Sequence, residues 1–418
     1  MSRVITAATG IFMIRFLTQS LGTQQYAAYA ILGGLLGWYS LSDMGLGSSL
    51  QNHISERRAK GESYDQFVTS SAVFGLLFFL GVVVALVLFS GVLGSVVLRK
   101  FDIFSYDQKR SYFLVFGVMS VAASIGSISY RIWFAEQKGY LANLSPAIAS
   151  VVSFLLVVAV SMSAKAHSLF WMLLAGFGPL AVLPMVAFVV QVTRKTTATF
   201  VFGAAVTRPL LIRGFKFWLA GLLAAGVLQV DYLVMSQYLQ PGDIVTYNLS
   251  SKVFLLMFFV YSSLLTAIWP VCAEASAAND WPTLLMHVRK TIALGIVLVV
   301  FCTGIFLLFK NQIIAVLSPK EIVDVPVSLI LLFGLYYLLR VWCDAFGMVL
   351  QSMSYMRPFV IYIPIQAALN ILIQILITKE IGVRGILIGL IASYILTAVW
   401  IAPWVVFRKR RQQTRVAC

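Results

Sequence analysis

Charged side chains inside otherwise apolar segments are the residues of this sequence most able to do chemistry. The basic ones are Arg15, Arg131, Lys252 and Arg340, and the acidic ones are Asp43, Asp231 and Asp344. A charge at the centre of a bilayer costs at least about 2.5 to 3.5 kcal/mol, so such residues usually face a cavity or one another. Embedded cations suit an anionic substrate, and an embedded carboxylate can bind a proton or a cation. We predict that these side chains line a substrate-binding or transport cavity.

Composition places these charges in a membrane protein. Of the 418 residues, 60% are hydrophobic and 11% are charged, against roughly 25% charged in a soluble domain. Mean hydropathy is +0.92. The net charge of +16 comes from short basic clusters between apolar segments, which indicates a membrane surface and not nucleic acid. The sequence lacks a phosphate-binding loop and the common hydrolase and metal motifs, so we predict neither an enzyme nor a bound cofactor or metal.

The apolar segments predict an all-α protein with about twelve transmembrane helices. Each span needs about 20 residues to cross roughly 30 Å of hydrocarbon. Arg15 within the first apolar run argues against a cleaved signal peptide, so we expect an uncleaved first helix. Aligning the two halves of the chain places the start of the seventh span before residue 1 in the first half, so this first helix looks clipped at its N-terminus. The predicted spans are 4–21, 25–47, 67–98, 112–135, 141–163, 169–192, 214–236, 248–271, 291–309, 327–350, 359–378 and 385–407.

The basic residues outside these spans predict the orientation of the chain. Most of them fall on one side, including Lys60, Lys195 and the tail from Arg408 to Arg415, whereas Lys109 and Lys320 fall on the other. Basic loops are enriched on the cytoplasmic side of a membrane. Both termini are therefore predicted to be cytoplasmic.

The longest basic connection follows the sixth span and divides the chain into similar halves. We predict an N-terminal lobe at 1–192, a cytoplasmic linker at 193–213, a C-terminal lobe at 214–407 and a basic tail at 408–418. The stretch LGTQQYAAY in the first half aligns with LQPGDIVTY at the matching place in the second. This repeat predicts two parallel six-helix bundles around a central cavity. Gly385 and Gly389 have the GxxxG spacing that permits close helix packing.

The charged candidates fall into groups with competing interpretations. Arg15, Asp231 and Lys252 are placed on the same side of the membrane and could meet at a central seam. Alternatively, Lys252 extends to the membrane surface and Asp231 neutralises a neighbour.

Two further pairs remain open in the same way. Arg340 and Asp344 are four residues apart and share a helix face, so they form either a local ion pair or part of a functional site. Asp43 and Arg131 are predicted near cytoplasmic helix ends, where a position at the interface is as easily explained as a function.

Three long stretches resemble O-antigen flippases of the Wzx type, in the multidrug/oligosaccharidyl-lipid/polysaccharide exporter superfamily. They begin SLGTQQYAAYAILGG in the first half, LQVDYLVMSQYLQPGD in the second and LLRVWCDAFGMVLQ near the tenth span. The resemblance implies that the chain is a flippase in the bacterial inner membrane. Its substrate would be an O-antigen repeat unit linked by diphosphate to undecaprenol, moved from the cytoplasmic to the periplasmic leaflet by alternating access.

The resemblance also implies partners and roles. The expected partners are the undecaprenyl-diphosphate-linked oligosaccharide and membrane lipid, with an O-antigen polymerase and a chain-length regulator as further candidates and no nucleic acid. Arg15, Asp43, Asp231 and Lys252 would line the cavity. Coupling to a proton or a sodium ion is left open.

Three alternative functions remain at this point, and one of them, a lipid II flippase, would be expected to have fourteen spans and not twelve. An ion-coupled drug exporter of the same superfamily would need a coupling carboxylate, which Asp231 could supply. An O-antigen polymerase would be an enzyme, but that family typically has a large periplasmic loop. The longest predicted periplasmic connection here runs only from Lys310 to Pro326.

Overall fold

The computed structural model describes residues 2–163, 168–195, 204–318, 324–353, 355 and 357–416. Throughout this part of the chain the regular structure is helical, which confirms the all-α prediction. Nine of the described helices are long and apolar enough to cross a membrane. They match nine of the predicted spans. The other three, at 4–21, 25–47 and 214–236, fall on helices that are kinked or interrupted.

The chain divides into two compact units. Unit 1 comprises Met1–Ala225 and Leu317–Glu321, and unit 2 comprises Gly226–Val316 and Ile322–Cys418. The predicted N-terminal lobe ended at residue 192, and the predicted C-terminal lobe began at residue 214. The predicted linker at 193–213 is helical where it is described. Residues 193–195 end α8 and residues 204–213 begin α9.

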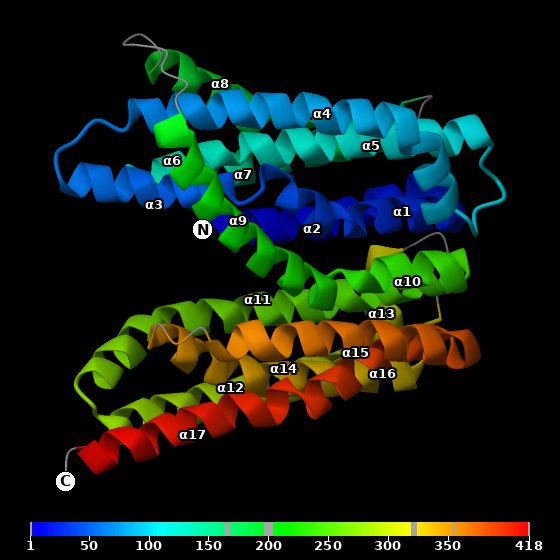
Figure 1. Cartoon of the computed structure of the whole chain (residues 1–418). Helices are drawn as coiled ribbons and strands as arrows, with labels where there is room; N and C mark the ends of the chain where they lie inside the picture. The colour runs from blue at the N-terminus through cyan, green and yellow to red at the C-terminus, as the bar shows by residue number, and fades with distance from the viewer. Residues whose placement is uncertain are drawn as a thin grey trace. The chain divides into compact units, whose positions relative to one another are not determined.

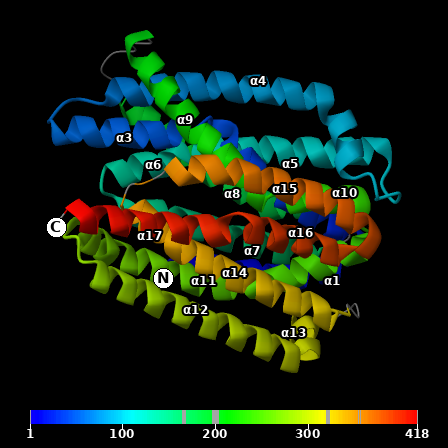
Figure 2. The ribbon, with the colours of Figure 1, turned by 60° about the horizontal axis from the view of Figure 1, so that its bottom comes forward.

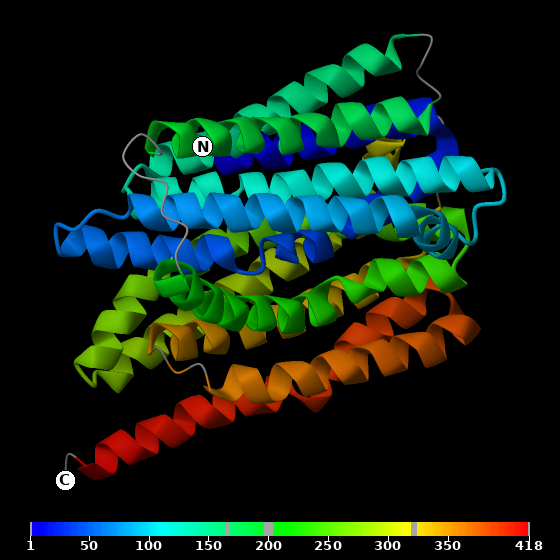
Figure 3. The ribbon, with the colours of Figure 1, turned by 45° about the horizontal axis from the view of Figure 1, so that its top comes forward.

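Unit 1 is a bundle in which α5 packs against α4 and α8, and α7 packs against α1 and α8. Figures 1 and 3 show α4 and α5 side by side. Its helices are α1 (Ser2–Gly34), α2 (Leu36–Tyr39), η1 (Ser40–Asp43), α3 (Leu46–Ala59), α4 (Asp65–Val97), α5 (Tyr106–Gly126), α6 (Ile128–Ala135), α7 (Gly139–Ser161), α8 (Leu169–Lys195) and most of α9 (Ala204–Leu228).

The predicted second span is not one helix. It begins after a kink in α1 at Gly22, where φ is 67°, and it breaks again at Met44 and Gly45, where φ is 48° and 70°. Such angles favour glycine because a Cβ would clash with the backbone. At Gly45 a Cβ would also collide with the carbonyl oxygen of Gly214 on α9. This close approach is one of the contacts between α9 and α3, beside the hydrogen bond that the Ser49 hydroxyl donates to the carbonyl oxygen of Leu210.

Unit 2 is a second bundle with α14 at its centre. Helix α14 packs against α11, α12, α16 and α17, and α15 packs against α16. Figure 2 shows α12, α14 and α17 running alongside one another. Its helices are α10 (Val230–Tyr238), α11 (Pro241–Ala277), α12 (Trp281–Leu308), α13 (Lys310–Leu317) except its last residue, α14 (Val327–Ser352), α15 (Arg357–Ile381), α16 (Val383–Leu396) and α17 (Ala398–Val416).

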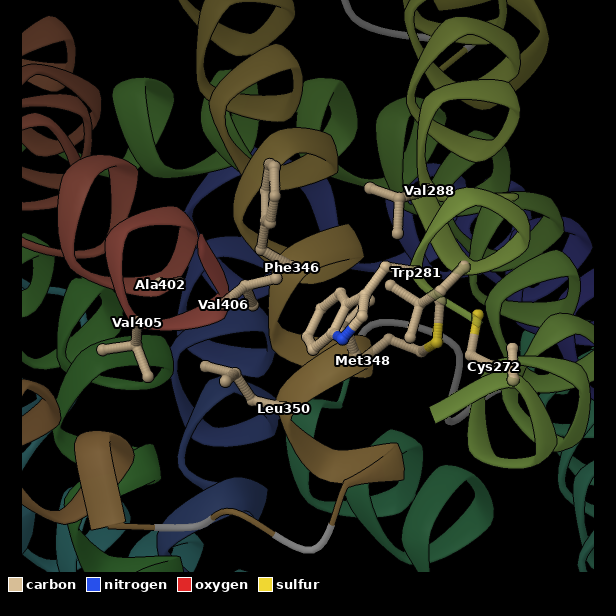
Figure 4. Packing of buried hydrophobic residues seen from close by; sticks show 12 residues of the cluster. Cys272, Trp281, Val288, Phe346, Met348, Leu350, Ala402, Val405 and Val406 are labelled. Atoms are coloured by element: carbon tan, nitrogen blue, oxygen red, sulfur yellow. The ribbon is translucent and has the colours of Figure 1, made fainter. Parts of the chain in front are cut away.

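Some apolar side chains of these bundles are buried between helices, and others are exposed on the outer face. In unit 2, a buried cluster around Trp281, Phe346 and Leu350 joins α11, α12, α14 and α17 (Figure 4). In unit 1, Leu88 and Val92 of α4 are 70% and 62% exposed. A soluble protein rarely exposes such a continuous apolar face, so this face is suited to lipid.

Candidate functional site

Asp231 is the most enclosed of the predicted charged residues. It lies in the first turn of α10 and is 6% exposed. Its carboxylate accepts a hydrogen bond of 2.5 Å from the Tyr247 hydroxyl of α11 and one of 2.7 Å from the Gln374 amide of α15. No arginine or lysine in the described part of unit 2 lies within ion-pair distance of it. A carboxylate held by neutral donors alone retains the capacity to bind a proton or a small cation.

A stripe of polar residues on α15 completes this site. Gln366, Asn370, Gln374 and Thr378 recur every fourth residue and are all buried, so they share one helix face. Gln374 Nε2 also donates to Asn370 Oδ1 at 2.9 Å. Within the described residues, Gln366 Nε2, Gln374 Oε1 and Thr378 Oγ1 have no hydrogen-bond partner. Buried polar atoms are normally paired, so these atoms are available to water, an ion or a ligand.

Sequence reasoning missed this stripe because it considered only ionisable residues inside the spans. The available signal was the spacing of four within the otherwise apolar span at 359–378. The predicted GxxxG pair does bring α16 close to α15. A Cβ on Gly385 would lie 2.6 Å from Thr378 Cα, and one on Gly389 would collide with the Gln374 side chain. The glycines therefore help to set the position of Gln374 against Asp231.

Arg340 and Asp344 form the local pair that their spacing allowed. Arg340 Nε lies 3.4 Å from Asp344 Oδ2, and the two side chains are 20% and 34% exposed. The guanidinium also lies 3.9 Å from the centre of the Phe258 ring and donates to the Tyr336 hydroxyl at 3.4 Å. The pair is therefore fixed by aromatic contacts as well as by charge.

Asp43 and Arg131 meet around Gly47. The Asp43 carboxylate accepts from the backbone N–H groups of Gly45 and Gly47 at 2.9 and 3.1 Å. These are donors at the start of α3 that have no intrahelical partner. A Cβ on Gly47 would lie 3.0 Å from Arg131 Cγ and 3.1 Å from Asp43 Oδ2. The sequence had placed both residues near helix ends without pairing them.

Arg15 and Lys252 have no carboxylate partner among the described residues. Arg15 is exposed on α1 in unit 1. Lys252 is half-buried on α11, which begins at Pro241 and not near residue 248 as predicted. Lys252 thus lies about 16 Å from the first residue of α11. At that distance its side chain reaches the membrane surface less easily than if the helix began near residue 248. The predicted approach of Arg15 to Asp231 and Lys252 stays a prediction.

A further ionic cluster at one end of unit 1 was not predicted. Glu136, between α6 and α7, lies 2.8 Å from Lys138 and 3.0 Å from Lys195. The Tyr64 hydroxyl donates to Glu136 at 2.9 Å. Burial disfavours the charged carboxylate, but these hydrogen bonds outweigh it and lower the pKa of Glu136 to about 2.

Curated relatives align with the chain over nearly its whole length. A candidate O-antigen export protein of Yersinia pseudotuberculosis is 34% identical over 405 residues, covering 96% of this chain and 93% of the relative. A candidate O-antigen transporter of Salmonella typhimurium is 35% identical over 408 residues, with the same coverage. The chain belongs to this O-antigen transporter family.

The family assignment agrees with two other comparisons. The MatE family matches residues 218–376. An inward-facing multidrug resistance MATE family transporter of the MOP superfamily has a TM-score of 0.79 at 13% identity, covering 98% of this chain and 96% of the other. Lipid II flippase MurJ in an inward closed conformation has a TM-score of 0.72 at 14% identity, with coverage of 97% and 86%. At these identities the structural matches establish the fold alone. The O-antigen transporter family is named for transport, so this multi-pass membrane protein is a transporter and not an enzyme.

Proposed function

We propose that this transporter is a flippase for undecaprenyl-diphosphate-linked O-antigen repeat units. It moves them from the cytoplasmic to the periplasmic leaflet of the bacterial inner membrane by alternating access, with both termini in the cytoplasm. The observation that carries the proposal is the match over 96% of the chain to relatives named for O-antigen export or transport. The proposed partners include an O-antigen polymerase and a chain-length regulator. The proposed lobes remain those of the sequence, with residues 193–213 as the linker between them.

The unpaired cations support a substrate that carries a diphosphate. Arg15 and Lys252 have no carboxylate partner within the described residues, so they retain charge for an anionic group. The lipid tail can stay in the bilayer while the polar headgroup crosses, because only the sugars and the diphosphate are costly to place in hydrocarbon.

Asp231 supports coupling to a proton or a sodium ion. Its two donors come from different helices, Tyr247 on α11 and Gln374 on α15. A bound cation would compete with these donors for the carboxylate and so alter the contacts among three helices. Vesicles with an imposed proton or sodium gradient, compared with an imposed membrane potential alone, would identify the driving force.

Deletion and complementation test the proposed function. A strain with no other flippase and without this transporter should accumulate lipid-linked single repeat units in the cytoplasmic leaflet and lose long surface O-antigen. The wild-type gene should restore both. Normal delivery of repeat units to the periplasm in the deleted strain would refute the proposal.

A drug exporter is the second candidate, since unit 2 offers a buried carboxylate beside aromatic rings. The Tyr232 and Tyr247 rings lie 6.1 Å apart next to Asp231, and Tyr247 contacts Phe333. Drug susceptibility of the deleted strain discriminates between the two. Greater sensitivity to cationic drugs with normal O-antigen would favour the exporter.

A further inference from the structure

Unit 1 contains a cavity of about 400 Å³ at the end where α3, α4, α6, α7 and α8 meet. In Figure 1 this is the end at which the loop joins α3 to α4. Basic residues and aromatic rings predominate in its lining, which consists of Arg58, Tyr64, Trp133, Glu136, Lys138, Gln191, Arg194 and Lys195. None of the charged candidates inside the spans contributes to it.

The lining has more positive charge than its own carboxylate can neutralise. Glu136 pairs with Lys138 and Lys195, and Lys195 also lies 3.6 Å from Asp65, just outside the lining. Arg58 and Arg194 are exposed and have no carboxylate partner among the described residues. One nitrogen of Arg58 donates to the carbonyl oxygen of Ala135 at 2.6 Å, and its other N–H groups are available to a ligand.

Size and chemistry limit what the cavity can hold. Arginine and lysine are the usual partners of phosphate oxygens, and arginine can bind two of them at once. A volume of about 400 Å³ is within the range of small-ligand sites but too small for a lipid-linked oligosaccharide. Basic pockets between transmembrane helices on the cytoplasmic side bind anionic lipid headgroups. Trp133 and Tyr64 are of the residue types enriched at that depth.

We propose that this cavity binds the phosphate group of a membrane lipid. Arg58 and Arg194 would contact the phosphate oxygens directly, with Lys138 at the rim. Glu136 would act against binding, because it is a negative charge in the same cavity and pairs with both lysines of the lining, Lys138 and Lys195. The phosphate can come from an anionic phospholipid or from a polyprenyl diphosphate, and the proposal does not depend on the substrate assigned above.

The test uses thermal stability of the purified full-length protein in an uncharged detergent. The probes are short-chain phosphatidylglycerol, phosphatidylcholine as the neutral comparison, and farnesyl diphosphate as the diphosphate source. Stabilisation by phosphatidylglycerol identifies a phospholipid site, and stabilisation by farnesyl diphosphate alone identifies a diphosphate site. Either result supports the proposal if it depends on Arg194.

Three variants make the test specific. Arg194→Gln should weaken binding of the effective probe about tenfold, because a charged hydrogen bond is lost. Arg99 is an exposed arginine after α4 and lies outside the cavity. The Arg99→Gln variant should therefore bind the effective probe as the wild type does. Glu136→Gln should tighten binding severalfold even if it lowers the basal melting temperature, which a purely structural ionic cluster would not do. The proposal is overturned if neither anionic probe stabilises the protein, or if Arg194→Gln and Arg99→Gln behave alike.

Discussion

Replacing Asp231 with asparagine should slow transport at least about tenfold while leaving the protein folded. Asparagine is nearly the same size, and its amide oxygen can still accept from Gln374, while Tyr247 can turn to accept from the new amide. Two charge-assisted hydrogen bonds become neutral ones, which costs roughly 2 kcal/mol. Part of this cost is offset because a charge is no longer buried. The net loss of stability should therefore stay below about 2 kcal/mol.

The effect on transport should be much larger than the effect on stability. If the carboxylate binds a proton or cation during the cycle, its loss removes a charged interaction of about 1.5 to 3 kcal/mol, or at least roughly tenfold in rate. Asp231→Ala is less informative. It leaves the Tyr247 hydroxyl and one of the two N–H groups of the Gln374 amide buried and unpaired, at about 1 to 3 kcal/mol each, and can fail by unfolding.

The assay is complementation of the deleted strain. Long surface O-antigen is measured beside the amount of folded transporter in the membrane. Asp324→Asn is the matched control, because Asp324 is in the same unit and its side chain is 81% exposed in a surface pair with Lys310. Such pairs contribute about 0 to 1 kcal/mol. Transport by Asp231→Asn at the wild-type level would refute the coupling role of this carboxylate.

Three further predictions address other parts of the molecule. Arg340→Ala should lower the free energy of unfolding by about 2 to 4 kcal/mol, because Asp344 loses its ionic partner and the cation–π contact with the Phe258 ring is lost. A thermal melt in detergent measures this loss. The Glu136 carboxylate, with a pKa of about 2 against an ordinary 4.5, should stabilise the protein fully above pH 4.5. That contribution, about 1 kcal/mol after solvent screening, should be lost as the pH falls towards 2. Cysteines placed at Lys60 and Lys109 should label from opposite sides of the membrane, with position 109 accessible from outside intact cells.

Controls make each of these results decisive. Arg384→Ala removes an exposed arginine from the same unit as Arg340 and should change the melting temperature little; an equal loss in both variants would contradict the pairing argument. Glu136→Gln should flatten the acid part of the stability profile, and an unchanged profile would exclude Glu136 as its cause. Labelling of position 60 from outside intact cells would reverse the proposed orientation.

The sequence was most informative where the bilayer imposes a simple length. Nine of the predicted spans match long, apolar helices. They were predictable because a run of about 20 apolar residues indicates a transmembrane helix in any membrane protein. The spans at 25–47 and 214–236 were less well predicted because their breaks depend on local backbone geometry. The positive φ angles at Met44 and Gly45 are one such case, and the break between α9 and α10 is another.

The candidate site could be only partly predicted for a related reason. Charge inside an apolar span identified Asp231, but its partners are neutral: Tyr247 is 16 residues away on the next helix, and Gln374 is 143 residues away. The spacing of four predicted that Arg340 and Asp344 could pair, and the structure shows the pair. The approach of Asp43 and Arg131 to the same glycine, Gly47, depends on the packing of α3 against α6, which no local pattern in the sequence encodes.

The central claim, movement of a lipid-linked oligosaccharide between leaflets, is tested most directly with purified protein in vesicles. The substrate is an undecaprenyl-diphosphate-linked repeat unit with a fluorescent sugar, and a membrane-impermeant quencher reports which leaflet holds it. We expect the wild-type protein to expose the initially protected fraction of the label to the quencher and Asp231→Asn to do so at least tenfold more slowly. If folded wild-type protein leaves the labelled substrate in its original leaflet yet moves a cationic drug across the same vesicles, the flippase account is wrong.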